Sequence, residues 1–308
     1  MVMPAIRPTI LAWLLDSDPA IRWQGLRDLT HEPTEAVAAE RSRVAREGWG
    51  AQLIGQQAKS GQWGAADDEG WMTTIDALAL LRELGADPKD KSVQRAISLV
   101  REKITWHQLD GRPFFDGETE ACINGSILAS GAYFGAPCEV LLKRLLSEQL
   151  DDGGWNCEAP NSKRSSFHST IRVLEGLLEY ETASGPFPAV TKAKHRGHEY
   201  LLARRMFRSL STGEVIDRRW EQFAFPTWWH YDVLRGLDYL RSAGVKPDER
   251  VTEAVDVVRQ RAHQNGRWPL NVVHDSRLPL VMEPGKGKAS RWNTLRALRV
   301  LEWYGSNE

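Results

Sequence analysis

The sequence QLDDGGW at residues 149–155, followed by FHSTIRVLEGLLEY at residues 167–180, decides the fold. In the first stretch a glutamine precedes a glycine turn, and a tryptophan closes the turn. In the second stretch apolar side chains recur at the three- and four-residue spacing of one face of an α-helix. A glycine turn followed by such a helix predicts one unit of a helical repeat.

The same combination occurs twice more. The turn QAKSGQW at 57–63 precedes WMTTIDALALLRELG at 71–85, and the turn QNGRW at 264–268 precedes RWNTLRALRVLEWYG at 291–305. Three copies of one turn, each followed by a leucine-rich helix, indicate a repeat architecture in which neighbouring units bury a shared core.

Two degenerate turns, at Gln108 and Trp220, precede the further helical stretches 121–135 and 229–244. These five helices are named the first series. When the first series is aligned by its leucines, one position is occupied by Thr74, Asn124, Thr170, Asp232 and Thr294. The alignment predicts that these five residues are structurally equivalent.

A second series of helices fits between members of the first. Its stretches are 92–104, 138–150, 190–205 and 251–264, and each has an apolar stripe backed by a charged face. A helix with one charged face lies at a surface, whereas the small and aromatic residues of the first series suit helices with neighbours on most sides. We therefore expect an all-α fold in which the first series is the inner layer and the second series the outer layer.

The N-terminal segment has a different pattern. Residues 10–15 predict a helix, Asp16–Pro19 a capped turn with proline at the first helical position, and IRWQGLRDL a second helix. This pair looks like a HEAT-type hairpin, and residues 33–57 supply helix for another pair. We assign 1–49 to this HEAT-like segment, packed on the repeats of 50–308 in one structural domain.

Composition excludes several classes of protein. The 308 residues include 40 Lys and Arg against 41 Asp and Glu, so no general electrostatic case exists for binding nucleic acid. No apolar run approaches the roughly 20 residues of a spanning helix, which leaves only peripheral contact with a membrane open. Three cysteines are too few for a disulfide framework, and the opening residues lack the apolar core of a secretory signal. We expect a cytoplasmic protein.

The turns resemble the QW repeats of squalene and oxidosqualene cyclases, a family that shares the α/α toroid with protein prenyltransferase β-subunits. The resemblance covers residues 50–308 and implies a closed ring of helical hairpins around a lumen. It implies structural roles, bonding a helix end and stacking between repeats, for Gln57, Gln149, Gln264, Trp63, Trp155 and Trp268.

For function, the resemblance implies a hydrophobic, isoprenoid-like small molecule in the lumen and an isoprenoid cyclisation or transfer. The acid motif D-x-D-D and the metal–diphosphate motif D-D-x-x-D do not occur, and neither Asp67-Asp68-Glu69 nor Asp151-Asp152 is a substitute. The alternatives are a non-catalytic ligand-binding or scaffold toroid and a zinc-dependent enzyme.

A zinc set follows from the first-series alignment. Two residues before the aligned position stand Met72, Cys122, His168, His230 and Trp292, which we expect at one end of the ring. Cys122, His168 and His230, joined by Cys157 from a loop, would form a tetrahedral set of nitrogen and sulfur ligands. The alternative is packed thiols and hydrogen-bonded imidazoles.

Three carboxyl groups are candidates for acid or base catalysis. Glu118 and Glu120 stand just ahead of a first-series helix, where desolvation would suit a general acid and where acids also favour a helix N-terminus. Asp232 replaces threonine in the alignment and lies beside His230, so we expect these two to act together.

Aromatic side chains are abundant, with 13 Trp in the chain. Their faces stabilise cations, and they also fill space between helices. We expect the substrate to be bound by Trp71, Met72, Asn124, Phe167, Trp228, Trp229 and Trp292.

Overall fold

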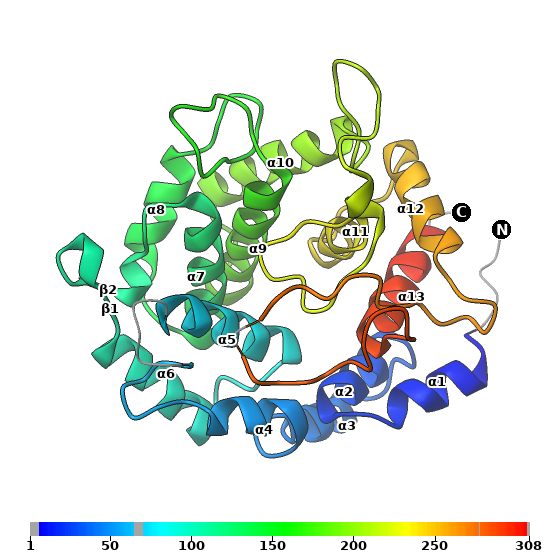
Figure 1. The fold of residues 1–308 in the computed structure, drawn as a ribbon, viewed down its shortest axis with the longest axis horizontal. Coiled ribbons are helices and arrows are strands. Elements are labelled where there is room, and N and C mark those ends of the chain that lie inside the picture. The colour runs from blue at the N-terminus through cyan, green and yellow to red at the C-terminus, as the bar shows by residue number, and fades with distance from the viewer. Residues whose placement is uncertain (1–5, 65–69, 277, 307–308) are drawn as a thin grey trace. The chain divides into compact units, whose positions relative to one another are not determined.

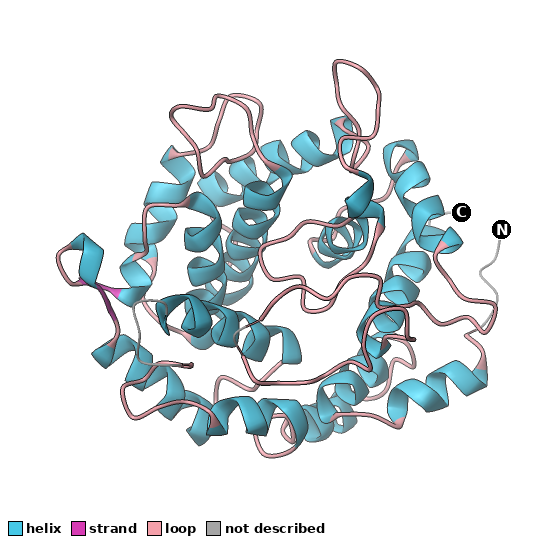
Figure 2. Cartoon of the chain, in the orientation of Figure 1, coloured by secondary structure: helices cyan, strands magenta, loops and turns pink. Residues whose placement is uncertain are grey.

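The computed structural model describes residues 6–64, 70–276 and 278–306, and this part of the chain is almost entirely helix and loop (Figures 1 and 2). Two short strands, β1 (Thr105–Trp106) and β2 (Arg112–Pro113), form one antiparallel pair. The expected all-α class is confirmed. Asp67, Asp68 and Glu69 lie outside the described residues.

Contacts divide the described residues into two compact units. Unit 1 draws its residues from Met1–Arg41, Leu201–Asp275 and Val281–Glu308, and unit 2 from Ser42–Tyr200 and Ser276–Leu280. The N-terminal helices therefore share a unit with the last helix of the chain. The domain boundary at residues 49 and 50 and the closure of the hairpins into a ring stay predictions.

Unit 2 consists of two layers of helices. One layer holds three first-series helices side by side: α5 (Gly70–Leu84), α7 (Ala121–Phe134) and α9 (Phe167–Ser184) (Figure 1). The other layer holds the second-series helices α6 (Lys91–Lys103), α8 (Glu139–Ser147) and most of α10 (Pro188–Ala203). Helix α4 (Gly48–Gly55) comes before these in the chain. Short 3-10 helices at His107–Leu109 and Phe114–Asp116 flank β2. The predicted alternation of helices is confirmed here.

Glycine explains how closely α7 and α9 approach each other. A Cβ atom added to Gly125 would lie 2.6 Å from the backbone carbonyl of Arg172, and one added to Gly176 would lie 2.5 Å from the carbonyl oxygen of Gly125. Such separations exclude any larger residue without movement of the backbone. The small residues of the first series therefore allow two helix backbones to pack in contact.

Unit 1 contains the N-terminal helices and the last repeats. Its helices are α1 (Pro8–Leu15), α2 (Pro19–Asp28), α3 (Thr34–Arg41), α11 (Val233–Ser242), α12 (Thr252–Gln260) and α13 (Arg291–Gly305), with 3-10 turns at Arg218–Glu221 and Glu249–Val251. Asp18 caps α2 by accepting from the backbone N–H of Ala20, and Pro19 is its first residue, as the sequence predicts. None of the helices described in either unit is long and apolar enough to cross a bilayer.

A buried charge cluster joins α2 to α13 in unit 1. Arg299 Nη2 lies 2.5 Å from Asp28 Oδ2 and donates to Gln24 Oε1 at 2.7 Å. Burial lowers the pKa of Arg299 to about 10, while Asp28 and Asp238 act in the opposite direction. A desolvated ion pair between Asp28 and Arg299 thus joins α2 of the N-terminal hairpin to α13, and it fixes how these two side chains face each other.

The tryptophan of each glycine turn is a structural residue. The backbone N–H of Trp155 donates to Thr170 Oγ1 at 3.0 Å, and its indole Nε1 donates to the carbonyl oxygen of Leu145 at 2.8 Å. The other two non-degenerate turns make the same pair of bonds. Trp63 bonds Thr74 and the Leu53 carbonyl oxygen, and Trp268 bonds Thr294 and the Val258 carbonyl oxygen. Each turn is therefore tied to the helix before it and to the helix after it.

The glutamine is structural in two copies. Gln149 Nε2 donates to the carbonyl oxygens of Gly153 and Ala193, and Gln57 Nε2 donates to those of Gly61 and Ala96. Gln264 was expected to match them and does not. In the third copy the backbone bonds from His263 to Arg267 and from Gly266 to His263 place Ala262 at the glutamine position, and Gln264 is exposed.

The alignment is also wrong for the fourth helix of the first series. Helix α11 begins at Val233, so Trp229 and His230 lie in the preceding loop instead of the first helical turn. Asp232 caps α11 by accepting from the backbone N–H of Arg235, as the serines Ser166 and Ser290 cap α9 and α13. Asp232 is therefore equivalent to those serines and not to Thr170.

Candidate functional site

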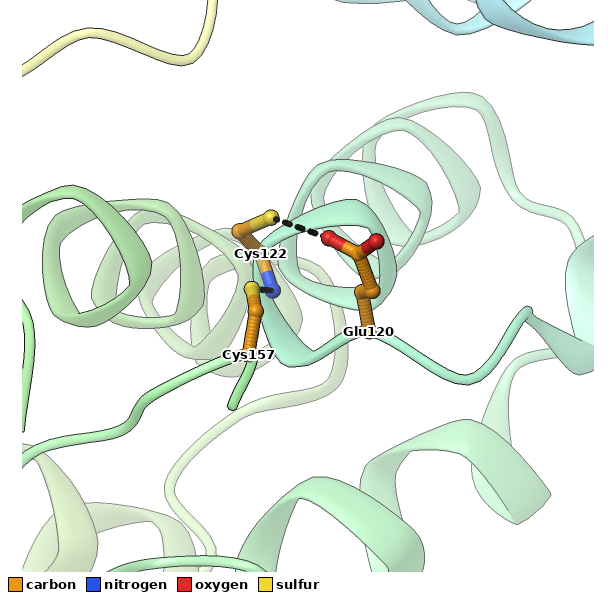
Figure 3. A group of neighbouring side chains, drawn as sticks. All are labelled: Glu120, Cys122 and Cys157. Atoms are coloured by element: carbon orange, nitrogen blue, oxygen red, sulfur yellow. Dashed lines mark hydrogen bonds between the residues drawn. The ribbon is translucent and has the colours of Figure 1, made fainter. Parts of the chain in front are cut away.

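Two cysteines and a glutamate converge at the N-terminus of α7 in unit 2 (Figure 3). Glu120 is the N-cap residue of this helix, Cys122 is in its first turn, and Cys157 comes from the loop that follows Trp155. One carboxylate oxygen and the two sulfur atoms all lie within 4.8 Å of one another. The structure thus brings together two of the four predicted zinc ligands.

The surroundings of Cys157 donate hydrogen bonds to its sulfur. The backbone N–H of Cys122 lies 3.2 Å from Cys157 Sγ, and Ser169 Oγ lies 3.2 Å from it. Hydrogen bonding from the Cys122 side chain, from Ser169 and from that N–H lowers the pKa of Cys157 to about 7, against burial and the charge of Glu120. The same contact with Cys157, together with burial, raises the pKa of Cys122. The pair therefore favours one thiolate, on Cys157.

The predicted four-ligand zinc set does not fit this group. Across residues 6–64, 70–276 and 278–306, Glu120, Cys122 and Cys157 are the only three acidic, thiol or imidazole groups that lie this close, and His168 is not among them. Arg172 donates to the Cys122 carbonyl oxygen at 3.2 Å, and its positive charge acts on the Cys122 thiol. Because this positive charge acts on the Cys122 sulfur, it opposes binding of a cation there, and the contacts suit a thiolate.

Glu118 and Asn124 form hydrogen bonds with each other at the N-terminus of α7. Asn124 is fully buried; its Oδ1 accepts from the backbone N–H of Glu118 and its Nδ2 donates to the Glu118 carbonyl oxygen. Glu118 Oε2 accepts from the backbone N–H of Glu120, whose own Oε2 lies 3.6 Å from Cys122 Sγ. Asn124 therefore has the connecting role that threonine has in the good copies.

In unit 1, Asp232 is held by backbone groups on both sides. It is 4% exposed and accepts from the N–H groups of Arg235 and Ala224 at 2.7 and 3.4 Å. Burial raises the pKa of Asp232, while Arg296 and these hydrogen bonds oppose the shift. Arg235 in turn donates to the carbonyl oxygens of Trp228 and His230. Asp232 thus anchors the loop that carries the aromatic residues.

That loop presents a stack of three rings. The His230 ring lies between Trp229, at 3.8 Å between centroids, and His274, at 3.7 Å. Trp229 is 52% exposed, whereas Trp228 is buried and has a positive φ of 46°. Burial lowers the pKa of His274, with Arg235 acting in the same direction. The stack therefore holds Trp229 with about half of its side chain exposed to solvent.

A second aromatic pair in unit 1 adjoins the half-buried side chain of Glu283. Trp292 stacks on Phe225 at 4.2 Å with an interplanar angle of 13°. Glu283 accepts from Ser290 Oγ at 2.6 Å and from the backbone N–H of Trp292 at 3.1 Å. Burial raises the pKa of Glu283 and these hydrogen bonds oppose the shift.

The predicted substrate residues of unit 2 differ in exposure. Phe167 is buried and packs against Tyr200 at 5.1 Å, so it fills space between helices. Trp71 is half-buried and packs against Trp106 at 5.3 Å, and Met72 is 40% exposed. Only Trp71 and Met72 of this group have surface to offer a ligand.

Sequence reasoning missed Glu283 and His274 because both lie in the long connection between α12 and α13, where no helical periodicity marks a position. The proline and glycine near Glu283 indicate a loop. One usable signal existed for Glu283: it is an acidic residue shortly before a helix whose cap, Ser290, the sequence shows.

No protein-family model and no curated protein matches this chain. Solved structures with a similar fold include a protein from Actinoplanes, with 16% identity, 94% of this chain and 90% of that chain covered, and a TM-score of 0.45. They also include the type II terpene cyclase MstE from Scytonema, without ligand (14% identity, 95% and 86% covered, TM-score 0.43) and as a variant in complex with geranylgeranyl dihydroxybenzoate (15%, 94% and 87%, 0.43). At these values the likeness carries no argument about function.

Proposed function

We propose that the chain binds an apolar, isoprenoid-like small molecule on the exposed face of Trp229. The observation that supports this proposal most is the ring stack of Trp229, His230 and His274, which keeps half of an indole in solvent. An indole face held rigidly in this way binds methyl-branched chains and cations with little loss of side-chain entropy. The QW-type turns of the sequence support the same class of ligand.

The chemistry would start from a carboxyl group in unit 1 whose pKa lies above its usual value. Burial raises the pKa of both Asp232 and Glu283. A carboxylic acid that keeps its proton at higher pH can donate it to a carbon–carbon double bond, and aromatic faces stabilise the carbocation that forms. Glu118 and Glu120 remain the alternative acids in unit 2.

Binding tests the proposal through a matched pair of variants. Farnesol, an isoprenoid alcohol, should bind the purified full chain, and Trp229→Ala should raise the Kd about 2- to 13-fold, as the loss of about 0.5 to 1.5 kcal/mol from roughly 20 to 60 Å² of apolar contact predicts. Phe187→Ala removes an aromatic side chain of similar exposure, 48%, from unit 2 and should leave the Kd unchanged. The proposal would be contradicted if the unaltered chain and both variants bound farnesol with equal affinity, or if the unaltered chain bound no farnesol.

A non-catalytic binding protein is the second candidate, and the absence of both D-x-D-D and D-D-x-x-D from the sequence favours it. Mass spectrometry of an isoprenoid incubated with the chain separates the two. An unchanged ligand supports the binding protein, whereas a product isomer that disappears in Asp232→Asn or Glu283→Gln supports the enzyme.

A further inference from the structure

The relation between Cys157 and Cys122 is independent of ligand binding in unit 1. Their sulfur atoms lie within 4.8 Å of each other although the residues are 35 positions apart in the chain. Both side chains are half-buried and free of any disulfide, so a small solute reaches them. Cys138, the third cysteine, is buried at 5% exposure.

The repeat turn fixes Cys157 in place. Two residues earlier, Trp155 is bonded to Thr170 through its backbone N–H, and its carbonyl oxygen accepts from the N–H of Ser166. The N–H of Cys157 then donates to Ser169 Oγ at 3.3 Å. The thiol is therefore carried by a short segment that is tied to α9 on both sides and faces the first turn of α7 (Figure 3).

Three donors or dipoles favour negative charge on this sulfur. The backbone N–H of Cys122 and the hydroxyl of Ser169 both lie 3.2 Å from it. That N–H is in the first turn of α7, where backbone N–H groups have no acceptor within the helix and the helix dipole is positive. The charge of Glu120 opposes the thiolate on Cys157, whereas the charge of Arg172 acts on the neighbouring Cys122 sulfur. A thiolate that accepts hydrogen bonds and has a second thiol beside it is the arrangement found in reactive dithiols.

We propose that Cys157 and Cys122 form a reversible dithiol–disulfide pair in which Cys157 is the thiol that reacts with a hydroperoxide. The Cys157 thiolate attacks one oxygen of hydrogen peroxide; an S–O bond forms, the O–O bond breaks, and the leaving oxygen departs as water after taking up a proton. The Cys122 thiol then attacks this sulfur, an S–S bond forms and a second water leaves. Two thiols are oxidised by two electrons and one peroxide is reduced, and a dithiol such as dithiothreitol reverses the change.

Closure of this bond would tie the loop after Trp155 to the first turn of α7. Glu120 is the N-cap residue just before that turn, and its carboxylate contact with Cys122 Sγ is lost when the sulfur becomes part of a disulfide. The oxidised and reduced chains therefore differ in the side-chain contacts made at the N-terminus of α7.

Peptide mapping tests the proposal on the full chain without reference to activity. After reduction, removal of metal with a chelator and treatment with hydrogen peroxide, we expect a Cys122–Cys157 cross-linked peptide that dithiothreitol removes. Cys138→Ser should give the same cross-link. Cys122→Ser should leave a sulfenic acid on Cys157 that dimedone traps, and Cys157→Ser should leave Cys122 largely unmodified.

Three results would overturn it. The first is absence of the Cys122–Cys157 cross-link in a chain whose circular dichroism shows it to be folded. The second is trapping of sulfenic acid equally on Cys122, Cys138 and Cys157. The third is stoichiometric binding of zinc that abolishes the peroxide reaction, since the group would then be a metal site.

Discussion

The indole nitrogen of Trp155 donates to the carbonyl oxygen of Leu145, ten residues earlier, at 2.8 Å. Trp63 bonds Leu53 and Trp268 bonds Val258 at the same spacing, at 2.6 and 2.7 Å. In each copy the bond satisfies a carbonyl group near the C-terminal end of the helix before the turn, where intrahelical donors run out. The tryptophans of the glycine turns thus connect layers and are buried, whereas the loop residue Trp229 is 52% exposed and can contact a ligand.

Thr170→Val should destabilise the chain by about 1 to 3 kcal/mol, because the buried N–H of Trp155 loses its acceptor while side-chain shape is kept. Urea unfolding followed by circular dichroism measures the change. Thr182→Val, at an exposed site of the same helix where the hydroxyl bonds only the Leu178 carbonyl oxygen, should change stability by less than about 0.5 kcal/mol. Equal effects of the two substitutions would refute the connecting role of Thr170.

Gly125→Ala should separate α7 from α9 and lower thermal stability, since the added methyl group meets the Arg172 backbone at 2.6 Å. We expect a cost of about 1 to 3 kcal/mol, the range for overpacked cores. Gly55→Ala is the matched control, because no atom lies within 4 Å of the added Cβ at this helical residue. It should be neutral or stabilise by up to about 1 kcal/mol, and calorimetry that ranks the two variants in the reverse order would show that the helix contact is misplaced.

Asp28→Asn should cost about 3 kcal/mol, because it leaves the Arg299 guanidinium, 5% exposed, without its closest carboxylate. Burial raises the pKa of Asp28, but Arg299 and Arg27 outweigh it, so the pKa lies below its usual 3.8. The pair therefore stabilises the fold above about pH 4, and this contribution is lost as the pH falls through the lowered pKa. Asp256→Asn, in an exposed pair with Arg259, should cost less than about 0.5 kcal/mol; an equal loss in both variants argues against the buried pair.

Alkylation by iodoacetamide should titrate Cys157 with a midpoint near pH 7, since hydrogen bonds from Cys122 and Ser169 lower its pKa to about 7. The thiolate is the reactive form, so the rate rises with pH through this midpoint and levels off above it. Cys138 is the internal control, because burial raises its pKa to about 11. Ser169→Ala should shift the Cys157 midpoint upward, and a midpoint above pH 8.5 in the unaltered chain would be incompatible with the geometry.

The sequence predicted most of the helices because their leucine spacing and caps are local signals. Asp18 and Pro19 mark the start of α2 without any tertiary information. Thr74, Thr170 and Thr294 could be aligned because each stands at the same place in its helix, and the structure explains the alignment by their shared bond to the turn tryptophan.

The errors arose where a side chain competes with helical periodicity. Asp232 ends the loop by capping α11, which overrides the apolar pattern that seemed to extend the helix back to Trp229. Gln264 was placed by residue type, whereas backbone bonds of the turn decide the register. The contact between Cys122 and Cys157 depends on the packing of α7 against α9, so the choice of these two cysteines was predictable but their thiolate geometry was not.

Extraction of the purified chain with organic solvent, followed by mass spectrometry, tests the proposed function most directly. We expect an isoprenoid-type compound to accompany the unaltered chain and to be depleted in Trp229→Ala but not in Phe187→Ala. A folded chain that carries no apolar compound and takes up no isoprenoid alcohol when one is supplied would contradict it.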